Sequence, residues 1–183
     1  MPQLKLLSEP TPGYGRAVNK GLAASRGEYI GIIRSDNQEK PEDLCAMFAE
    51  LHNSGFMLYK AVRTQRMNEG ANRIVVSFFY NTLFKILFGL RSSDINASPK
   101  VFTRALYERV RPESLDFFTD AEIMIKAEYL GASIGNWPIV YMARLKGRSS
   151  VRLKHVFEFL RNMVWWRVHL RGKMRELAAA ESA

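Results

Sequence analysis

Two kinds of hydrophobic pattern alternate along the chain and predict alternating strands and helices. Continuous apolar runs, typical of strands covered on both faces, occupy residues 28–36, 56–62 and 132–144, the last with a break at Pro138. Apolar residues at helical spacing predict helices over residues 14–26, 41–53, 73–88, 104–111 and 119–130. This alternation predicts one α/β domain built on a mostly parallel sheet with flanking helices.

The predicted helices begin and end at residues suited to those positions. Pro41 opens the second helix, with two acidic residues in its first turn that complement the helix dipole, and Gly55 ends it. In the stretch TDAEIMIKAEYLG, Thr119 is predicted as the N-cap, Glu122 as its capping-box partner and Gly131 as the residue after the C-cap.

Composition is typical of a globular protein with anionic partners. The 183 residues are 47% hydrophobic, enough for a full core, and no run of 18 apolar residues is present. The N-terminus lacks the pattern of a secretory signal, and the single Cys45 excludes an internal disulfide, which fits a reducing cytoplasm. The net charge of +9 favours nucleic acid, phosphorylated metabolites or an anionic membrane as partners.

Asp36 and Gln38 follow a predicted buried strand and are the first candidates for a functional site. Ligands of open α/β sheets bind at the carboxyl ends of the strands. A spacing of two in an extended segment directs both side chains the same way, so both oxygens can reach one Mg²⁺ ion. The alternative is that the two residues cap the turn before the helix that begins at Pro41.

Basic residues follow two other predicted strands. They are Arg63, Arg66 and Arg73 after the second strand, and Arg144, Lys146 and Arg148, together with Ser149, after the last one. Arginine binds phosphate in a bidentate manner and lysine supplies a point charge, so basic loops converging at one sheet edge predict a phosphate site. The alternative is a set of solvated surface charges.

Three carboxylates are candidates for acid–base chemistry or for pairing with these arginines: Asp94, Asp120 and Glu122. For Glu122 the capping box is a strong alternative, although one carboxylate can cap a helix and line a pocket. The three histidines lie in predicted helices and have no predicted catalytic role.

The last segment, residues 151–183, predicts a basic amphipathic helix beyond a first unit of residues 1–150. Between residues 148 and 176, eight Lys or Arg residues oppose two acids, and they surround apolar residues that include Phe157, Val164 and the pair Trp165–Trp166. Tryptophans and arginines beside an apolar face are typical of a membrane interface. The alternative is a helix that packs back on the sheet with its charges in water.

Five blocks, in order, resemble family 2 glycosyltransferases, in particular the branch of dolichol-phosphate and polyprenyl-phosphate sugar synthases. GYGRAVNKGLAASRGEYI resembles the family's glycine-rich segment, helix and strand, and RSDNQEKPEDL resembles its Asp-Ala-Asp-x-Gln-x-Pro-Glu-Asp-Leu block. VRTQR with the following helix resembles its arginine loop, SSDINASPKVFTR resembles Asp-x-x-Ser-Gly-Phe-Lys, and the end in RLKGRSS resembles Arg-x-x-Gly-x-Ser. The resemblance covers residues 13–150.

This resemblance implies a GT-A type α/β fold and inverting transfer of a sugar from a UDP- or GDP-linked donor to a polyprenyl or dolichyl phosphate, with Mg²⁺ or Mn²⁺. It implies a cytoplasmic protein, peripheral on the inner face of an anionic membrane, and no nucleic-acid partner. The catalytic residues would be Asp36, Arg63, Arg66, Asp94 and Glu122, with Asp36 and Gln38 on the metal. The substrate-binding residues would be Gly13, Gly15, Arg34, Arg73, Lys100, Arg144, Lys146, Arg148 and Ser149.

Two departures from the family pattern open alternatives. Arg34 stands at the place of the family's first metal-binding Asp, where a cation would repel a metal or touch the diphosphate directly. The family's N-terminal βαβ unit, with its Pro-x-Tyr-Asn-Glu and Asp-Asp-Gly-Ser motifs, is absent from this sequence. We therefore expect an N-terminally truncated sheet, with a separate N-terminal half or a membrane subunit as candidate partners. The alternative function is a non-catalytic module that binds lipid phosphates or membranes.

Overall fold

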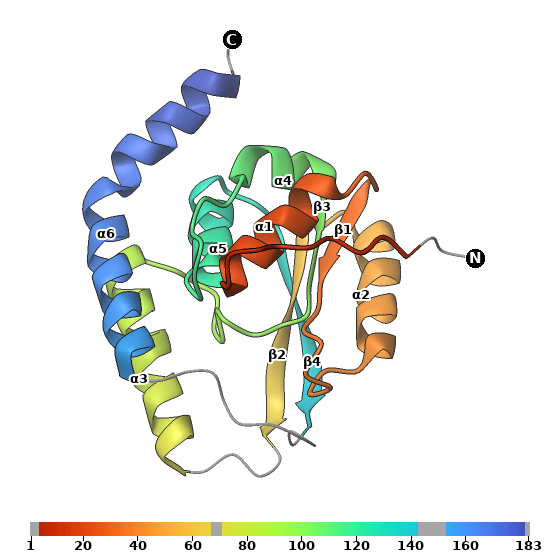
Figure 1. Cartoon of the computed structure of the whole chain (residues 1–183), viewed down its shortest axis with the longest axis horizontal. Coiled ribbons are helices and arrows are strands. Elements are labelled where there is room, and N and C mark those ends of the chain that lie inside the picture. The colour runs from red at the N-terminus through yellow and green to blue at the C-terminus, as the bar shows by residue number, and fades with distance from the viewer. Residues whose placement is uncertain (1–3, 67–70, 143–152, 182–183) are drawn as a thin grey trace.

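The computed structural model describes residues 4–66, 71–142 and 153–181, which form a mixed α/β fold (Figure 1). In chain order the elements are α1 (Tyr14–Ala24), β1 (Tyr29–Ile32), α2 (Pro41–Ser54), β2 (Leu58–Arg66), α3 (Ala71–Phe88), β3 (Lys100–Thr103), α4 (Arg104–Val110), α5 (Thr119–Tyr129), β4 (Ile134–Tyr141) and α6 (Leu153–Glu181). The predicted alternation of strands and helices is confirmed.

The strands of the sheet are in the order β1-β3-β2-β4, and β3 corrects the prediction of a mostly parallel sheet. β2 and β4 pair in parallel, but β3 is antiparallel to both of its neighbours. Figure 1 shows the path: after α3, residues 89–99 lead into the sheet, where β3 starts opposite Lys60 of β2 and runs in the opposite direction. Hydrophobic runs indicate strands but carry no information on strand direction.

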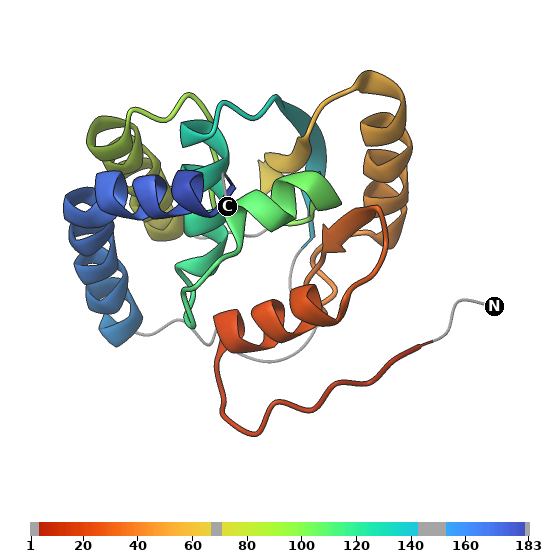
Figure 2. The same ribbon diagram turned by 90° about the horizontal axis from the view of Figure 1, so that it is seen from above.

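Helices cover both faces of the sheet (Figures 1 and 2). On one face lies α2, whose Met47 and Leu51 form a cluster with Tyr59 and Val101. The approach of α2 is close, because a Cβ on Gly31 would lie 3.0 Å from the side chain of Leu44. On the other face lies α5, and α3 and α6 lie side by side beyond it, in a larger core that includes Leu58, Phe84, Phe102, Phe118, Ile123 and Trp166.

Glycines correctly predicted the ends of two helices, whereas the capping box predicted for the start of α5 is not formed. Gly55 and Gly131 follow α2 and α5 with left-handed φ angles of 71° and 70°, as expected for glycines after a helix. The capping box at α5 is wrong, because the hydroxyl of Thr119 donates to the carbonyls of Ser114 and Asp116 instead of capping the helix.

The predicted break at Pro138 is also wrong, because β4 runs without interruption from Ile134 to Tyr141. Pro138 lies opposite Val62 in the register with β2, and β4 is an edge strand of the sheet. An edge strand tolerates proline because its amide can face away from the ladder.

Candidate functional site

The carboxyl ends of β1, β2 and β4 and the start of β3 meet at one edge of the sheet, at the bottom of Figure 1. Side chains from these strands, from the loops next to their ends and from α5 form what we call the strand-edge site. Its members are Arg34, Asp36, Gln38, Glu39, Arg63, Asp94, Lys100, Asp120 and Tyr141. Carboxyl ends of strands are where open α/β sheets bind ligands.

Arg34, the residue that departs from the family pattern, is paired with a carboxylate that sequence reasoning missed. Its Nε donates to Oε1 of buried Glu39 at 2.8 Å, and its backbone amide donates to Oε2 at 3.1 Å. The hydroxyl of Ser98 donates to the same Oε2 at 2.8 Å. Burial alone would lower the pKa of Arg34, but Glu39, with Tyr141 and Asp120, raises it above its ordinary value. The guanidinium therefore stays charged while Glu39 compensates its charge.

The loop of Asp36 and Gln38 is fixed to the end of β4. The side chain of Gln38 is buried, donates to the carbonyl of Met142 at 3.1 Å and accepts from the hydroxyl of Tyr141 at 3.1 Å. Oδ1 of half-buried Asp36 lies 3.4 Å from the backbone amide of Gln38, and Asn37 between them is left-handed, with φ 60°. The two residues shape the turn and lie at the strand edge, and their role as metal ligands stays a prediction.

The donor set at this loop fits a divalent cation that takes most of its ligands from elsewhere. Among the described residues, no group of three His, Cys, Asp or Glu side chains is placed to hold a metal. Asp36 supplies a carboxylate, whereas Glu39 is bound to Arg34 and Ser98. Mg²⁺ commonly takes one or two carboxylates and completes its shell with substrate phosphates and water.

Arg63 and Asp94 form a second ion pair at the edge. Nε of Arg63 donates to Oδ2 of Asp94 at 2.9 Å, its Nη2 contacts Oδ1, and its backbone amide donates to Oδ2 at 3.0 Å. The ring of Tyr141 lies between the two arginines, 5.7 Å from the Cζ of Arg34 and 5.4 Å from that of Arg63. Asp94 has a left-handed φ of 52°, a conformation that Asp tolerates better than most residues.

Lys100 and Asp120 form a third pair, to which Tyr14 adds a hydroxyl. Nζ of fully buried Lys100 lies 2.6 Å from Oδ1 of Asp120 and also donates to the carbonyl of Ala97 at 2.6 Å. The hydroxyl of Tyr14 donates to Oδ2 of Asp120 at 2.7 Å. Burial, together with the charge of Asp120, raises the pKa of Tyr14 well above its ordinary value, so this phenol remains a donor.

The predicted glycines lie where α1 begins, against the loop that precedes α5. Gly13 is the N-cap of α1 in an extended conformation. A Cβ on Gly15 would lie 2.2 Å from Oγ1 of Thr119 and 2.6 Å from the carbonyl carbon of Leu115. This close approach lets the neighbouring Tyr14 reach Asp120. In the described contacts the glycines position a side chain of the site.

Glu122, which was predicted to be catalytic, has its contacts in α5 and the loop before it and is not a member of the strand-edge site. It is fully buried, 2.7 Å from Nζ of Lys126, and its two oxygens accept from the backbone amides of Glu113 and Ser114 at 2.8 and 2.7 Å. These contacts hold a loop in place. Asp120, two residues earlier, is the carboxylate that α5 contributes to the strand-edge site.

Several predicted phosphate-binding residues lie outside the described part of the molecule. Arg66 ends β2 and Arg73 lies in α3, but their side chains are outside it. The residues of the RLKGRSS segment, Arg144, Lys146, Arg148 and Ser149, also lie outside the described residues. Their predicted roles stay predictions.

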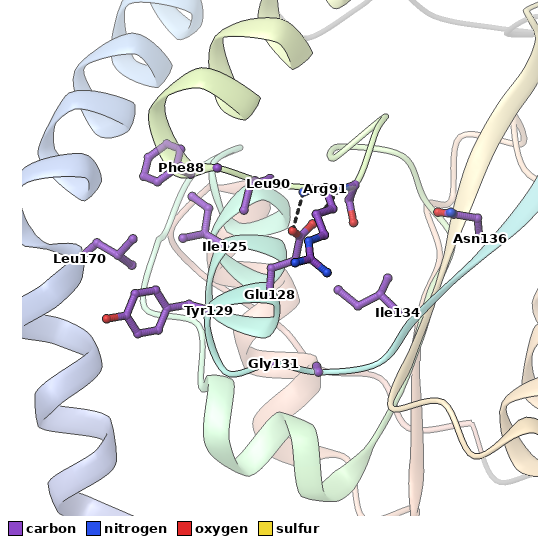
Figure 3. Close-up of a pocket in the computed structure, with 13 residues that line it drawn as sticks. Phe88, Leu90, Arg91, Ile125, Glu128, Tyr129, Gly131, Ile134, Asn136 and Leu170 are labelled. Atoms are coloured by element: carbon purple, nitrogen blue, oxygen red, sulfur yellow. Dashed lines mark hydrogen bonds between the residues drawn. The ribbon is translucent and has the colours of Figure 1, made fainter.

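A cavity of about 560 Å³ lies at the other end of the sheet (Figure 3). Its wall includes Ile134 and Asn136, at the start of β4, and Glu128, which accepts hydrogen bonds from the amides of Arg91 and Ser92 at 2.7 and 2.9 Å. The strand-edge site contains Tyr141, the last residue of β4, roughly 20 Å further along at 3.3 Å per residue. The cavity therefore lies away from Tyr141, although its Asn136 is in register with Lys60 and its Ser92 is two residues from Asp94.

One side of α6 packs back on the core, as the alternative prediction for the C-terminal segment states, and its other side exposes apolar side chains. Its inward side chains, among them Phe159, Met163, Trp166 and Leu170, are buried in the main core. Phe157, Val164 and Val168 are 61–72% exposed, and the neighbouring α3 exposes Phe78, Phe79 and Ile86. In the part of the chain that the structure describes, no helix is long and apolar enough to cross a membrane.

Solved structures with the same fold confirm the GT-A architecture. Glucosyl-3-phosphoglycerate synthase from Mycobacterium tuberculosis in complex with phosphoglyceric acid superposes with a TM-score of 0.66 at 19% identity, over 90% of this chain and 56% of that one. The complex of the same enzyme with Mn²⁺, uridine diphosphate and phosphoglyceric acid gives 0.65 at 19% identity, over 90% and 55%.

Sequence comparisons give the family. A curated relative, the dodecaprenyl-phosphate galacturonate synthase of Rhizobium johnstonii, is 23% identical over 167 residues, which are 89% of this chain and 48% of the relative. The chain thus spans about half the length of this relative. Residues 2–111, more than half of the chain, match the model of glycosyl transferase family 2, and the protein belongs to that family.

Proposed function

We propose that this protein transfers a sugar from a nucleotide sugar to a polyprenyl phosphate at the surface of a membrane. The observation that carries the proposal is the strand-edge site, in which two guanidinium groups flank Tyr141 within reach of the carboxylates of Asp36 and Asp94. The name of the Rhizobium johnstonii relative specifies a polyprenyl phosphate, which supports this acceptor class.

On the donor side, Arg34 and Asp36 face the diphosphate. Arg34 is fixed by Glu39, whose Oε1 lies 2.8 Å from its Nε and 2.6 Å from its Nη2. A guanidinium carries five N–H donors, so this pairing still leaves donors that suit a phosphate oxygen. Asp36 would hold a divalent cation, which, when bound, supplies positive charge to the departing nucleoside diphosphate. M. tuberculosis glucosyl-3-phosphoglycerate synthase has been solved with Mn²⁺ and with UDP, which supports this use of a metal.

On the acceptor side, Arg63 is the countercharge for the lipid phosphate. A phosphate oxygen is already anionic near neutral pH, so it can attack the anomeric carbon without a strong base while the bond to the diphosphate breaks. Asp94 holds Arg63 through both side-chain and backbone contacts, which fixes the orientation of the guanidinium group. Attack opposite the leaving group gives inversion at the anomeric carbon.

The exposed apolar side chains of α6 and α3 would rest on the membrane that holds the acceptor. Arg161, Arg167 and Arg171 on α6 are exposed beside them and suit anionic headgroups. The protein would then be peripheral on the cytoplasmic face. A separate N-terminal half or a membrane subunit remains a candidate partner, since the chain covers 48% of its relative.

The transfer is tested by incubating the full chain with labelled UDP- and GDP-sugars, Mn²⁺ and vesicles containing undecaprenyl phosphate. The proposal expects label in the lipid phase, dependent on both metal and lipid phosphate. Label that never leaves the nucleotide sugar, with every tested donor, contradicts it.

The membrane contact is tested by co-sedimentation with phosphatidylglycerol vesicles. We expect Phe157→Asp to weaken binding about tenfold or more, because a buried aromatic side chain contributes about 1.5–3 kcal/mol. The matched control is Leu4→Asp, which changes a 97% exposed residue far from α6 in the sequence and should bind like the wild type. Vesicle binding without any nucleotide binding would favour the alternative of a non-catalytic lipid-phosphate module.

A further inference from the structure

Lys60 is a buried ammonium group in β2, next to the strand-edge site. Its side chain is 0% exposed and donates a hydrogen bond to the carbonyl of Ser93. In the sheet register it lies opposite Lys100 on β3 and Asn136 on β4. Side chains at directly paired positions lie on the same face of a sheet, so two lysines are neighbours in the interior.

Lys60 differs from the ion-paired residues of the site and of α5 because, among the residues that the structure describes, it has no carboxylate within ion-pair distance. The remaining pairs are Arg34–Glu39, Arg63–Asp94, Lys100–Asp120 and Lys126–Glu122. Within the described part of the chain, the polar contact of Lys60 is the Ser93 carbonyl, which has no formal charge. Since burial of an unpaired charge is costly, the fold holds one positive charge that an anion nearby would stabilise.

Through its contact with Ser93, Lys60 also fixes the backbone next to Asp94. Ser93 precedes Asp94, whose carboxylate holds Arg63. Lys100 donates to the carbonyl of Ala97, three residues after Asp94. Two lysine ammonium groups thus fix the backbone on both sides of the carboxylate that orients Arg63.

We propose that Lys60 is a positioning residue that holds Asp94 and Arg63 in place and couples the binding of a phosphate-type anion to the uptake of a proton. The inference rests on the proposed function, because it takes the phosphates of the proposed substrates as the anion. No contact between Lys60 and the ligand is required, since its charge acts through Ser93 and across the site.

The electrostatic surroundings of Lys60 give the pH range. Burial, and then the charge of Lys100 on β3, lower its pKa from 10.5 to about 8. Asp94 in the preceding loop and Glu128 on α5 act in the opposite direction, Arg63 on β2 lowers the pKa, and Asn136 on β4 is uncharged. An anion bound beside Arg63 raises the pKa again, so Lys60 takes up a proton on binding when the pH is near 8.

The test is calorimetric titration of inorganic pyrophosphate into the full chain at pH 7, 8 and 9. Each titration is repeated in two buffers of different protonation enthalpy, which gives the protons taken up per ligand. We expect an additional uptake of up to about half a proton near pH 8 relative to Lys60→Met, since a group with this pKa is already half protonated there. We also expect roughly tenfold weaker binding by the variant. The ligand's own proton changes are the same for both proteins and cancel in this difference. Lys85→Met, which removes an exposed lysine of α3, should match the wild type.

Equal proton uptake by the wild type and Lys60→Met overturns the role of Lys60, as does an absence of pyrophosphate binding. If Lys60→Met does not fold, the wild type alone decides: no rise in uptake between pH 7 and 8 beyond that of the free ligand overturns the inference. Sugar transfer that persists without Lys60-linked uptake removes this inference and leaves the proposed function standing. Lys60-linked uptake without sugar transfer does the reverse.

Discussion

Two buried groups of charges in this protein have similar chemistry and different surroundings. In the helix cluster, formed by Glu122, Lys126, Glu113 and Lys173, both oxygens of Glu122 accept backbone amides, and Lys126 donates to the carbonyl of Arg111. In the strand-edge site, Arg34 lies in the loop after β1 and Arg63 lies in β2, and both guanidinium groups contact the ring of Tyr141.

The difference teaches how a stabilising cluster is told from a binding site. Every contact of Glu122 described here is internal and ties α5 to the loop before it. The strand-edge site presents cations at the end of the sheet where ligands of this architecture bind. Substitutions in the helix cluster should therefore act on stability, and those in the strand-edge site on binding and transfer.

The largest expected effect is on the helix cluster. Glu122→Gln leaves Lys126 buried without its main carboxylate, and breaking a buried pair in this way costs about 3–5 kcal/mol of unfolding free energy. Urea unfolding followed by circular dichroism measures the loss. The control Glu113→Gln removes a half-exposed carboxylate and should cost less than about 1 kcal/mol. A stable Glu122→Gln variant that loses sugar transfer would reverse the comparison and return Glu122 to catalysis.

The next effect is on transfer. Asp94→Asn keeps the shape of the side chain but removes the charge that orients Arg63, so we expect transfer to fall by about 10²-fold or more. Single-turnover assays with labelled donor measure it. An Asp94→Asn variant that transfers at the wild-type rate would remove the Arg63–Asp94 pair from the mechanism.

A third prediction concerns pH and Lys60. Its pKa of about 8 in the folded protein lies below the ordinary 10.5, so between these values the unfolded chain binds a proton that the folded chain does not. The free energy of unfolding should therefore rise from pH 8 towards pH 10, by roughly 2 kcal/mol. Unfolding curves at each pH measure the rise, which Lys60→Met should lack. The same slope in both proteins would assign it to other groups.

The smallest effect separates two glycines of α1. Gly15→Ala places a Cβ 2.2 Å from Thr119 and close to backbone atoms, so we expect a loss of about 1–3 kcal/mol in unfolding free energy. Gly21 has no atom within 4 Å of such a Cβ, and Gly21→Ala should stabilise the helix by about 0.5–1 kcal/mol. Thermal unfolding measures both, and a stabilising Gly15→Ala would contradict the close packing of α1.

Local sequence signals predicted the elements and the place of the site. The helix α2 begins at Pro41 and ends before Gly55, and Asp36 follows β1 at the predicted strand edge. Such signals are set by residues that are close in sequence, so they can be recognised without knowledge of the three-dimensional structure.

Contacts between distant segments could not be predicted in this way. Tyr14 and Asp120 meet across 106 residues, and Gln38 and Tyr141 across 103. The antiparallel β3 also depends on the path of residues 89–99 in space. The pairing of Arg34 with Glu39 spans five residues, but it forms because burial beside Ser98 brings the two together.

The most direct test of the strand-edge site is calorimetric titration of UDP with Mn²⁺, and of GDP with Mn²⁺, into the full chain and into Asp36→Ala. We predict metal-dependent binding of at least one nucleotide to the wild type and its loss in Asp36→Ala, with unchanged unfolding curves. Equal binding by the two proteins, or none by either up to millimolar ligand, would contradict a donor site at Asp36.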